Sequence, residues 1–377
     1  MGAYRLIASC ALLAACRGEP SAARSQHASA VAAQGACCEV ATTASSAQLA
    51  MAAPAVATSQ TAAPNPRPEP APAPDPVAAL LALGGEHSTS LGAPGNGSVR
   101  GAVALPERGP GFLHNPKRPA GARYGTVELV QAIVRAAAVV ERELPGSGLV
   151  VNDIGLEGGG RIAQHGSHQS GRDADILFYV LDRERQPLPS VGVPIEPDGT
   201  GYDYKELHVP DDDVLVRLDA PRTWRFMQAL IEDRGEQLQR IFLVEHVRAM
   251  LLAAAEKQRA PAAIRERFGA LTCQPGTPHD DHMHVRLFCT PEDIAQGCYD
   301  KPPIYPWQRD ALAALGLAAV LEPPSNRAQR NAEVEERTTS PAEARAKAGP
   351  MHKTVRQFLK RREAWLKQPH PGREYCK

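Results

Sequence analysis

The segment Asp173-Ala-Asp175-Ile176-Leu-Phe-Tyr-Val-Leu181 contains the clearest run of apolar side chains in the chain. A short run of this kind, here residues 176–181, is typical of a strand buried within a sheet. The two carboxylates, Asp173 and Asp175, come directly before it. Because side chains alternate between the two faces of a strand, both carboxyl groups point the same way. The segment therefore predicts a buried strand with acidic groups at its head.

Further strands and helices are predicted on both sides of this strand. Apolar patterns predict helices at residues 126–144, 221–231 and 245–259, and strands at residues 149–154, 240–244 and 284–288. The elements are mixed without a strict strand–helix–strand rhythm. This favours the α+β class, with a central, largely antiparallel sheet and flanking helices. Residues 183–215 hold many Pro, Gly and Asp residues and predict a long surface insertion.

The N-terminal region has the composition of an exported, tethered protein. Residues 1–16 combine one positive charge with a short apolar stretch and predict a signal peptide. The end of this segment, Leu13-Ala-Ala-Cys16, resembles a bacterial lipobox, in which Cys16 would be acylated; an ordinary signal peptide cut nearby is the alternative. Residues 17–85 are rich in Ala and Pro and predict a disordered linker. We therefore expect a periplasmic lipoprotein that meets the membrane only through Cys16.

Charge balance limits the classes of partner. The 377 residues carry 42 Lys and Arg against 42 Asp and Glu, a formal net charge of zero. This excludes a strongly basic nucleic-acid binder, so no nucleic-acid partner is expected. We expect the folded catalytic domain at residues 86–305 and a helical, charged C-terminal extension at residues 306–377. A basic helix predicted at residues 355–367 is either a solvated face or a contact for an anionic polymer or lipid.

Cysteine spacing favours disulfides over a thiolate metal site. None of the eight cysteines forms a Cys-x-x-Cys pair, which argues against zinc bound by thiolates. In an oxidising compartment the later cysteines can pair with one another. Cys289 and Cys298 lie close enough in sequence to close a small loop, and the other pairings stay open.

Histidines and carboxylates cluster in two short windows. Five of the twelve histidines lie in His165-Gly-Ser-His168-Gln-Ser-Gly171-Arg-Asp173-Ala-Asp175 and in His279-Asp280-Asp281-His282-Met-His284. On a strand, His282 and His284 point the same way, roughly 7 Å apart. If the strands of the two windows are neighbours, Asp175 and His284 approach one point, which His168 can reach across a turn.

Two imidazoles and one carboxylate form the ligand set of a catalytic zinc, with a fourth position left for water. The metal site is therefore expected at His168, Asp175 and His284, with one Zn²⁺ per chain. His282 is then placed to take a proton from that water and return it to a leaving amine.

Six further residues are candidates around this site. His165 and His279 could bind substrate, orient ligands or hold a second metal. Arg161 is a candidate for steadying a substrate carboxylate or a developing oxyanion. Asp173 is a candidate for contacting substrate or supporting the ligands from behind, and Asp280 and Asp281 are candidates for fixing histidine tautomers.

These motifs resemble the LAS metallopeptidases, and more closely the penicillin-insensitive murein endopeptidase family. The pattern His-x6-Asp at His168 and Asp175, with a distant His-x-His at His282 and His284, carries the resemblance. It covers roughly residues 90–298. The resemblance implies zinc held by His168, Asp175 and His284, with His282 as the catalytic base. It also implies hydrolysis of the D-alanyl–meso-diaminopimelate cross-link between peptidoglycan stem peptides, without inhibition by β-lactams.

Two other functions fit the same residues. One is a D,D-carboxypeptidase that trims stem peptides, and the other is a weakly catalytic lipoprotein that binds peptidoglycan. The linker, the insertion at residues 183–215 and the tail after residue 305 have no counterpart that we can place in the family. The insertion follows the strand bearing Asp175, so the preferred bond stays open.

Overall fold

The computed structural model describes residues 75–146, 148–163, 165–235, 237–276, 279–323, 341–367 and 376. The predicted signal peptide, the acylation of Cys16 and the predicted linker up to residue 74 therefore lie outside the described residues. Among the described helices, none is long and apolar enough to cross a membrane.

A seven-stranded sheet organises the described residues, in the order β14-β13-β15-β8-β7-β5-β4. Its strands are β4 (Arg108–Gly109), β5 (Phe112–His114), β7 (Leu149–Val151), β8 (Asp173–Leu177), β13 (Leu238–Phe242), β14 (Thr272–Cys273) and β15 (His282–Leu287). Four of the six pairings are antiparallel, including β15 with β8 and with β13; β5 with β7 and β13 with β14 are parallel. The predicted α+β class with a largely antiparallel sheet is confirmed.

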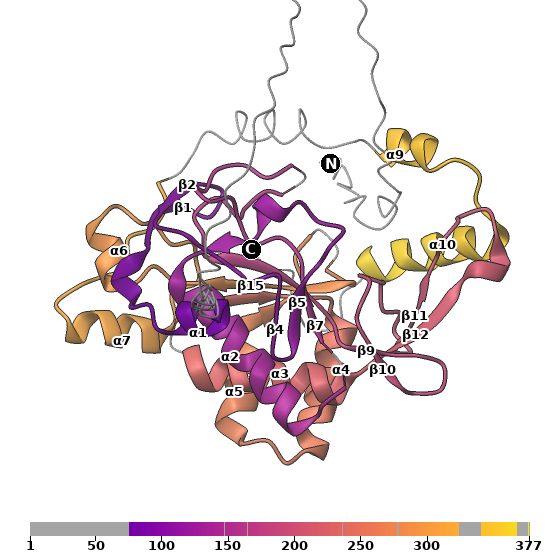
Figure 1. The fold of residues 1–377 in the computed structure, drawn as a ribbon, viewed down its shortest axis with the longest axis horizontal. Helices are drawn as coiled ribbons and strands as arrows, with labels where there is room; N and C mark the ends of the chain where they lie inside the picture. The colour runs from indigo at the N-terminus through magenta and orange to yellow at the C-terminus, as the bar shows by residue number, and fades with distance from the viewer. Residues whose placement is uncertain are drawn as a thin grey trace, which may run out of the picture. The chain divides into compact units, whose positions relative to one another are not determined.

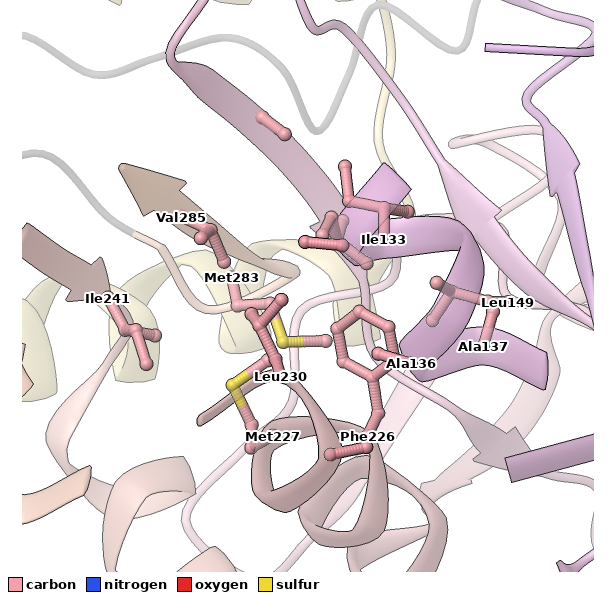
Figure 2. Packing of buried hydrophobic residues seen from close by; sticks show 14 of the residues in the cluster. Ile133, Ala136, Ala137, Leu149, Phe226, Met227, Leu230, Ile241, Met283 and Val285 are labelled. Atoms are coloured by element: carbon pink, nitrogen blue, oxygen red, sulfur yellow. The ribbon is translucent and has the colours of Figure 1, made fainter. Parts of the chain in front are cut away.

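Helices cover one side of this sheet (Figure 1). They are α2 (Val127–Glu143), α3 (Ala220–Arg234), α4 (Glu245–Lys257) and α5 (Ala262–Leu271), and the first three correspond to the predicted helices. Figure 2 shows the core between the two layers, where Ile133 of α2 and Phe226 of α3 lie near Met283 of β15. Met283 and Val285 are fully buried in that core. Because side chains alternate along β15, its histidines lie on the opposite face of the sheet.

The predicted strand at residues 176–181 is divided between two sheets. β8 ends at Leu177, and β9 (Val180–Leu181) joins a four-stranded sheet of order β10-β9-β12-β11. The partners are β10 (Pro187–Leu188), β11 (Thr200–Asp203) and β12 (Val214–Leu218), with the 3-10 turn η4 (Pro210–Asp212) before β12. Most of the predicted surface insertion at residues 183–215 is exposed or half-buried, as predicted, but part of it forms strands of this second sheet. Val193 and Ile195 within it are buried, since they pack into the common core.

The folded region begins earlier than the sequence predicted. Helix α1 (Pro76–Leu81) lies inside the range assigned to the linker. The Asp75 side chain caps its first turn, and Val77 and Leu80 are buried in the core. The linker boundary at residue 85 is therefore corrected to the start of α1, whose two buried apolar side chains dock it on the core.

The remaining helices and strands complete the described fold. They are η2 (Gly85–His87), β1 (Thr89–Ala93), β2 (Asn96–Arg100), β3 (Val103–Ala104), η3 (Ala120–Ala122), β6 (Tyr124–Gly125), α6 (Pro291–Ala295), α7 (Pro306–Ala314), α9 (Pro341–Ala348) and α10 (Lys353–Lys367). The described parts of the C-terminal extension thus contain helices, as predicted.

Two disulfides link described residues. Cys289 and Cys298 are bonded, with 5.9 Å between their Cα atoms, which confirms the predicted loop. Cys273 and Cys376 form the second bond, across 103 residues of sequence. The sequence left that pairing open, and it ties the end of the chain to β14.

Arg172 is a fully buried cation that links distant segments on the path into β8. Its side chain is 1% exposed, and its Nη1 lies 3.0 Å from Oδ1 of the fully buried Asp300. It also donates to the Leu287 and Tyr299 carbonyl oxygens and to the Ser90 hydroxyl. These bonds satisfy the guanidinium, as a buried charge requires.

We expect Arg172→Ala to lower the free energy of unfolding by about 3–5 kcal/mol, because it leaves the Asp300 carboxylate buried without its partner. Urea unfolding followed by circular dichroism measures this loss. Arg135→Ala is the control, since Arg135 pairs with Asp233 at 2.9 Å on the surface, and it should cost less than about 1 kcal/mol. Equal losses in the two variants would contradict the assigned role of Arg172.

Candidate metal centre

Two neighbouring strands bring four of the predicted site residues together. β8 and β15 pair in antiparallel register, with His284 directly opposite Asp175. Asp173 and Asp175 share one face of β8, and His282 and His284 share the matching face of β15. The face is the one turned away from the helices, so the hydrophobic core lies behind the site.

His168 reaches the same point from the loop before β8. Its side chain is fully buried, and its Nδ1 lies 2.8 Å from the carbonyl oxygen of Ile154. Its backbone φ of 69° lies in the left-handed region, which residues other than glycine adopt rarely. Such a conformation persists only where the surroundings impose it, and it is frequent at functional sites.

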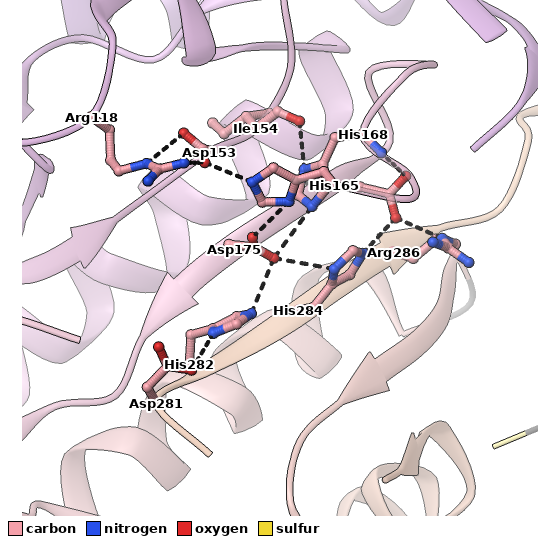
Figure 3. Close-up of polar contacts among 11 residues, drawn as sticks. Arg118, Asp153, Ile154, His165, His168, Asp175, Asp281, His282, His284 and Arg286 are labelled. Carbon is pink, nitrogen blue, oxygen red and sulfur yellow. Dashed lines mark hydrogen bonds and ion pairs between the residues drawn. The ribbon is translucent and has the colours of Figure 1, made fainter. Parts of the chain in front are cut away.

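The carboxyl group of Asp175 is the centre of the cluster, as Figure 3 shows. Its Oδ1 lies 3.3 Å from His168 Nε2, 3.1 Å from His284 Nδ1 and 3.5 Å from His282 Nε2. Its Oδ2 lies 3.5 Å from His165 Nδ1. Four imidazoles thus direct one ring nitrogen each at a single carboxylate. Two of them, His168 and His284, were predicted to converge there, with His282 beside them.

The remaining ring nitrogen of each imidazole is held by an oxygen farther out. In the order of the sequence, the partners are Asp153 for His165, Ile154 for His168, Asp281 for His282 and Asp173 for His284, at 2.6–2.8 Å. Such outer acceptors fix the orientation and tautomer of a histidine that binds a metal. The inner nitrogens are therefore available as ligands.

Asp173 lies behind His284, away from solvent. Its Oδ1 accepts hydrogen bonds from His284 Nε2 and Arg286 Nε, both at 2.6 Å. Burial raises the pKa of Asp173, but Arg286 and His284 outweigh burial and hold the pKa well below its usual range. Because Asp173 is fully buried, the geometry favours support of His284 over contact with substrate.

The electrostatics keep Asp175 ionised and His282 basic. Burial raises the pKa of Asp175, but the charges of His168 and His282 lower it well below its usual range. Burial lowers the pKa of His282, but Asp281 and Asp175 outweigh burial and raise it to about 9. The cluster thus offers a charged oxygen ligand beside an imidazole with a strong affinity for a proton.

The residues present fit a metal ion. His168 Nε2 and Asp175 Oδ1 are buried, and neither makes a hydrogen bond within the described residues. An unsatisfied buried polar atom is costly, so two of them side by side call for a common partner. Ligand atoms of His165, His168 and Asp175 lie within 4.8 Å of one another, and His284 Nδ1 also borders Asp175. Two ligand sets are thus available, and both contain His168 and Asp175.

Comparison with known proteins agrees with this arrangement. The sequence model of the penicillin-insensitive murein endopeptidases matches residues 90–346, more than half of the chain. The chain belongs to this family. It is therefore a peptidoglycan hydrolase of the endopeptidase class, and the resemblance carried by the histidine motifs is confirmed.

Curated members of the family from several bacteria are similar over most of their length. A penicillin-insensitive murein endopeptidase of Klebsiella pneumoniae subsp. pneumoniae is 31% identical over 242 residues, covering 64% of this chain and 79% of the relative. That of Pectobacterium atrosepticum is 30% identical over 57% of this chain and 70% of the relative. That of Haemophilus influenzae is 29% identical over 58% and 73%, respectively.

Two other predicted residues lie farther from Asp175 or at the surface. The ring of His279 lies 4.8 Å from that of His282 and 5.8 Å from that of His284, between ring centroids, so it borders the site from the β15 side. Arg161 is exposed, and its contact with substrate stays a prediction.

Sequence reasoning missed the acceptor behind His165. Asp153 is 1% exposed, and it binds both His165 Nε2 and the guanidinium of Arg118. Burial raises the pKa of Asp153, but His165 and Arg118 outweigh burial and lower it. The available signal in the sequence was the position of Asp153, an acidic residue near the end of the strand predicted at residues 149–154.

Proposed function

We propose that the chain is a zinc endopeptidase that hydrolyses D-alanyl–meso-diaminopimelate cross-links in peptidoglycan. The pair of unsatisfied buried atoms, His168 Nε2 and Asp175 Oδ1, supports this proposal most strongly. Nitrogen and carboxylate ligands suit zinc, and three protein ligands leave a position for water. Bound zinc would lower the pKa of a water molecule and polarise the peptide carbonyl.

In this proposal His168, Asp175 and His284 hold the metal, and His282 moves the proton. Asp281 occupies His282 Nδ1, so Nε2 is the nitrogen directed into the site. From there its neutral form takes a proton from the attacking water and returns it to the leaving amine. His165 stays a further candidate ligand.

The proposed surroundings follow from the substrate and from the N-terminal sequence. Peptidoglycan stem peptides are the proposed partners, the periplasm is the proposed location, and Cys16 is the proposed lipid anchor. The motif Leu13-Ala-Ala-Cys16 supports the anchor.

Digestion of purified sacculi tests the reaction. We expect loss of cross-linked muropeptide dimers, with no change when penicillin is present, because no serine takes part. Chromatography and mass spectrometry of the products measure this. Release of free D-alanine with dimers left intact would instead identify a D,D-carboxypeptidase, and binding to sacculi without either product would identify a binding protein.

Removal of the metal tests the cofactor on the same preparation. We expect one zinc per chain by elemental analysis, loss of cleavage after treatment with a chelator, and recovery when one equivalent of Zn²⁺ is returned. Zinc should also raise the melting temperature, since a ligand of the folded state stabilises it. Mg²⁺ is the control and should restore neither property. Full activity in metal-free protein would rule out the proposed chemistry.

A further inference from the structure

Helix α10 lies beyond the part of the chain that matches the family, yet it contacts the segment that carries His282. The family match ends at residue 346, and α10 spans Lys353–Lys367. Figure 1 shows α10, in yellow, beside strands β11 and β12. Its arginines reach Glu196 and Asp280, which belong to two separate loops of the catalytic domain. The helix therefore contributes charged contacts that the family match does not include.

Arg362 makes the more buried of these contacts. Its Nε and Nη2 donate to the two carboxylate oxygens of Asp280 at 2.7 and 2.9 Å, a bidentate pair. The Asp280 side chain is fully buried, and that of Arg362 is 11% exposed. A buried carboxylate needs such a partner, because loss of it leaves an uncompensated charge. The position of Asp280 thus depends on α10.

Asp280 directly precedes Asp281, the residue that orients His282. Asp281 Oδ1 lies 2.7 Å from His282 Nδ1, and Asp281 follows Asp280 in the chain. The backbone of the segment is also fixed: Ile195 N–H donates to the Asp280 carbonyl at 2.7 Å, and Val244 N–H donates to that of His279 at 2.9 Å. The ion pair between Arg362 and Asp280 adds a side-chain contact to these backbone hydrogen bonds. Asp280 is one residue away from Asp281, whose carboxylate sets the direction of the His282 ring.

The helix is itself held firmly on the catalytic domain. Phe358 packs on Tyr204, and Trp365 packs on the ring of His246, with centroids 5.6 Å apart in both cases. These apolar contacts hold α10 on the catalytic domain and keep Arg362 beside Asp280.

We propose that α10 clamps the segment at residues 279–282 and that Arg362 is a positioning residue for the Asp281–His282 pair. Arg362 acts through Asp280 and touches neither substrate nor metal. The proposal rests on the proposed role of His282 in proton transfer. The clamp makes the C-terminal extension part of the catalytic unit. It gives α10 a function different from the two predicted alternatives, a solvated helix face or a contact for an anionic polymer or lipid.

Adjacent arginines on one helix provide a matched experiment in the full-length chain. Arg361 forms a bidentate pair with Glu196 at 2.8 Å, as Arg362 does with Asp280, but Arg361 is half exposed and its partner is not next to Asp281. Arg362→Gln and Arg361→Gln are compared for kcat and KM on a soluble cross-linked muropeptide dimer. Zinc content and melting temperature are measured on the same preparations. The kinetics are run below the lowest of these melting temperatures.

We expect Arg362→Gln to lower kcat about 10- to 100-fold with KM and zinc content unchanged, because a misplaced proton-transfer group costs turnover. Arg361→Gln should keep the parental kcat. Arg362→Lys retains the cation and should recover part of the lost kcat. If Arg362→Gln does not fold, Arg362→Lys against Arg361→Gln decides the matter: a several-fold lower kcat for the lysine variant supports the clamp.

Equal kcat values in the Arg362 and Arg361 variants would overturn the proposal, as would a change confined to KM. The variant His282→Ala separates this failure from that of the proposed function. If His282→Ala is inactive while the Arg362 variants are not, the role of His282 stands and the clamp falls. If His282→Ala is fully active, the proton-transfer role itself is wrong.

Discussion

Replacing His282 by alanine is expected to lower turnover about 10²- to 10⁴-fold while leaving one zinc bound per chain. The reason is the division of its ring nitrogens. Nδ1 is held by Asp281 at 2.7 Å, and Nε2 points into the site 3.5 Å from Asp175 Oδ1. The residue thus borders the proposed ligands without being needed to complete either ligand set. Kinetics on cross-linked muropeptide dimers and elemental analysis measure the two properties.

The control for this variant is His87→Ala, which removes an exposed histidine in η2 and should change neither turnover nor zinc content. Asp281→Asn provides an intermediate case. It keeps the size of the orienting side chain but removes its charge, so we expect a smaller loss of turnover than for His282→Ala. Zinc loss in His282→Ala would show that this imidazole is a ligand, and parental turnover would show that it is dispensable.

Replacing His168 by alanine is expected to abolish both zinc binding and cleavage. His168 belongs to both available ligand sets, and its Nε2 is a buried atom whose need for a partner the metal would satisfy. With His168 absent, neither set is complete: the remaining His165 and His284 border different oxygens of Asp175, Oδ2 and Oδ1, and His168 is the imidazole that both sets share. Elemental analysis after gel filtration measures the loss.

The variants His165→Ala and His284→Ala distinguish the two ligand sets. If His168, Asp175 and His284 hold the zinc, His284→Ala loses it and His165→Ala retains it. The reverse result would assign the metal to His165, His168 and Asp175 instead. Retention of zinc in His168→Ala would contradict both proposed ligand sets.

The local pattern of the chain was enough to predict the class of fold and the two strands of the site. Alternation along residues 282–284 and around Asp175 requires only the geometry of a strand, which sequence carries directly. The sequence did not predict that the chain passes from the seven-stranded to the four-stranded sheet after Leu177, because the apolar run continues without a break to Leu181. The burial of Ile195 was missed because the surrounding Pro, Gly and Asp residues are typical of loops.

The ligand candidates were predictable, whereas the residues that orient them were harder to find. His168 and Asp175 stand in a short, recognisable spacing. Asp153 and Arg362 lie on separate elements, and no spacing links them to the histidines that they support. Contacts between such distant positions depend on tertiary packing, as does the disulfide that closes across 103 residues.

The alternation along β15 couples the stability of the enzyme to its chemistry. Met283 and Val285 fill the hydrophobic interior, and His282 and His284, their immediate neighbours, face the reactive side. A protein interior is packed as densely as a crystal, so a change of volume at Met283 shifts the backbone by fractions of an ångström. Such a shift reaches the imidazoles at once. Substitutions of the buried apolar side chains beneath this strand should therefore alter the catalytic rate as well as the melting temperature. Directed evolution for heat resistance would have to leave these side chains unchanged.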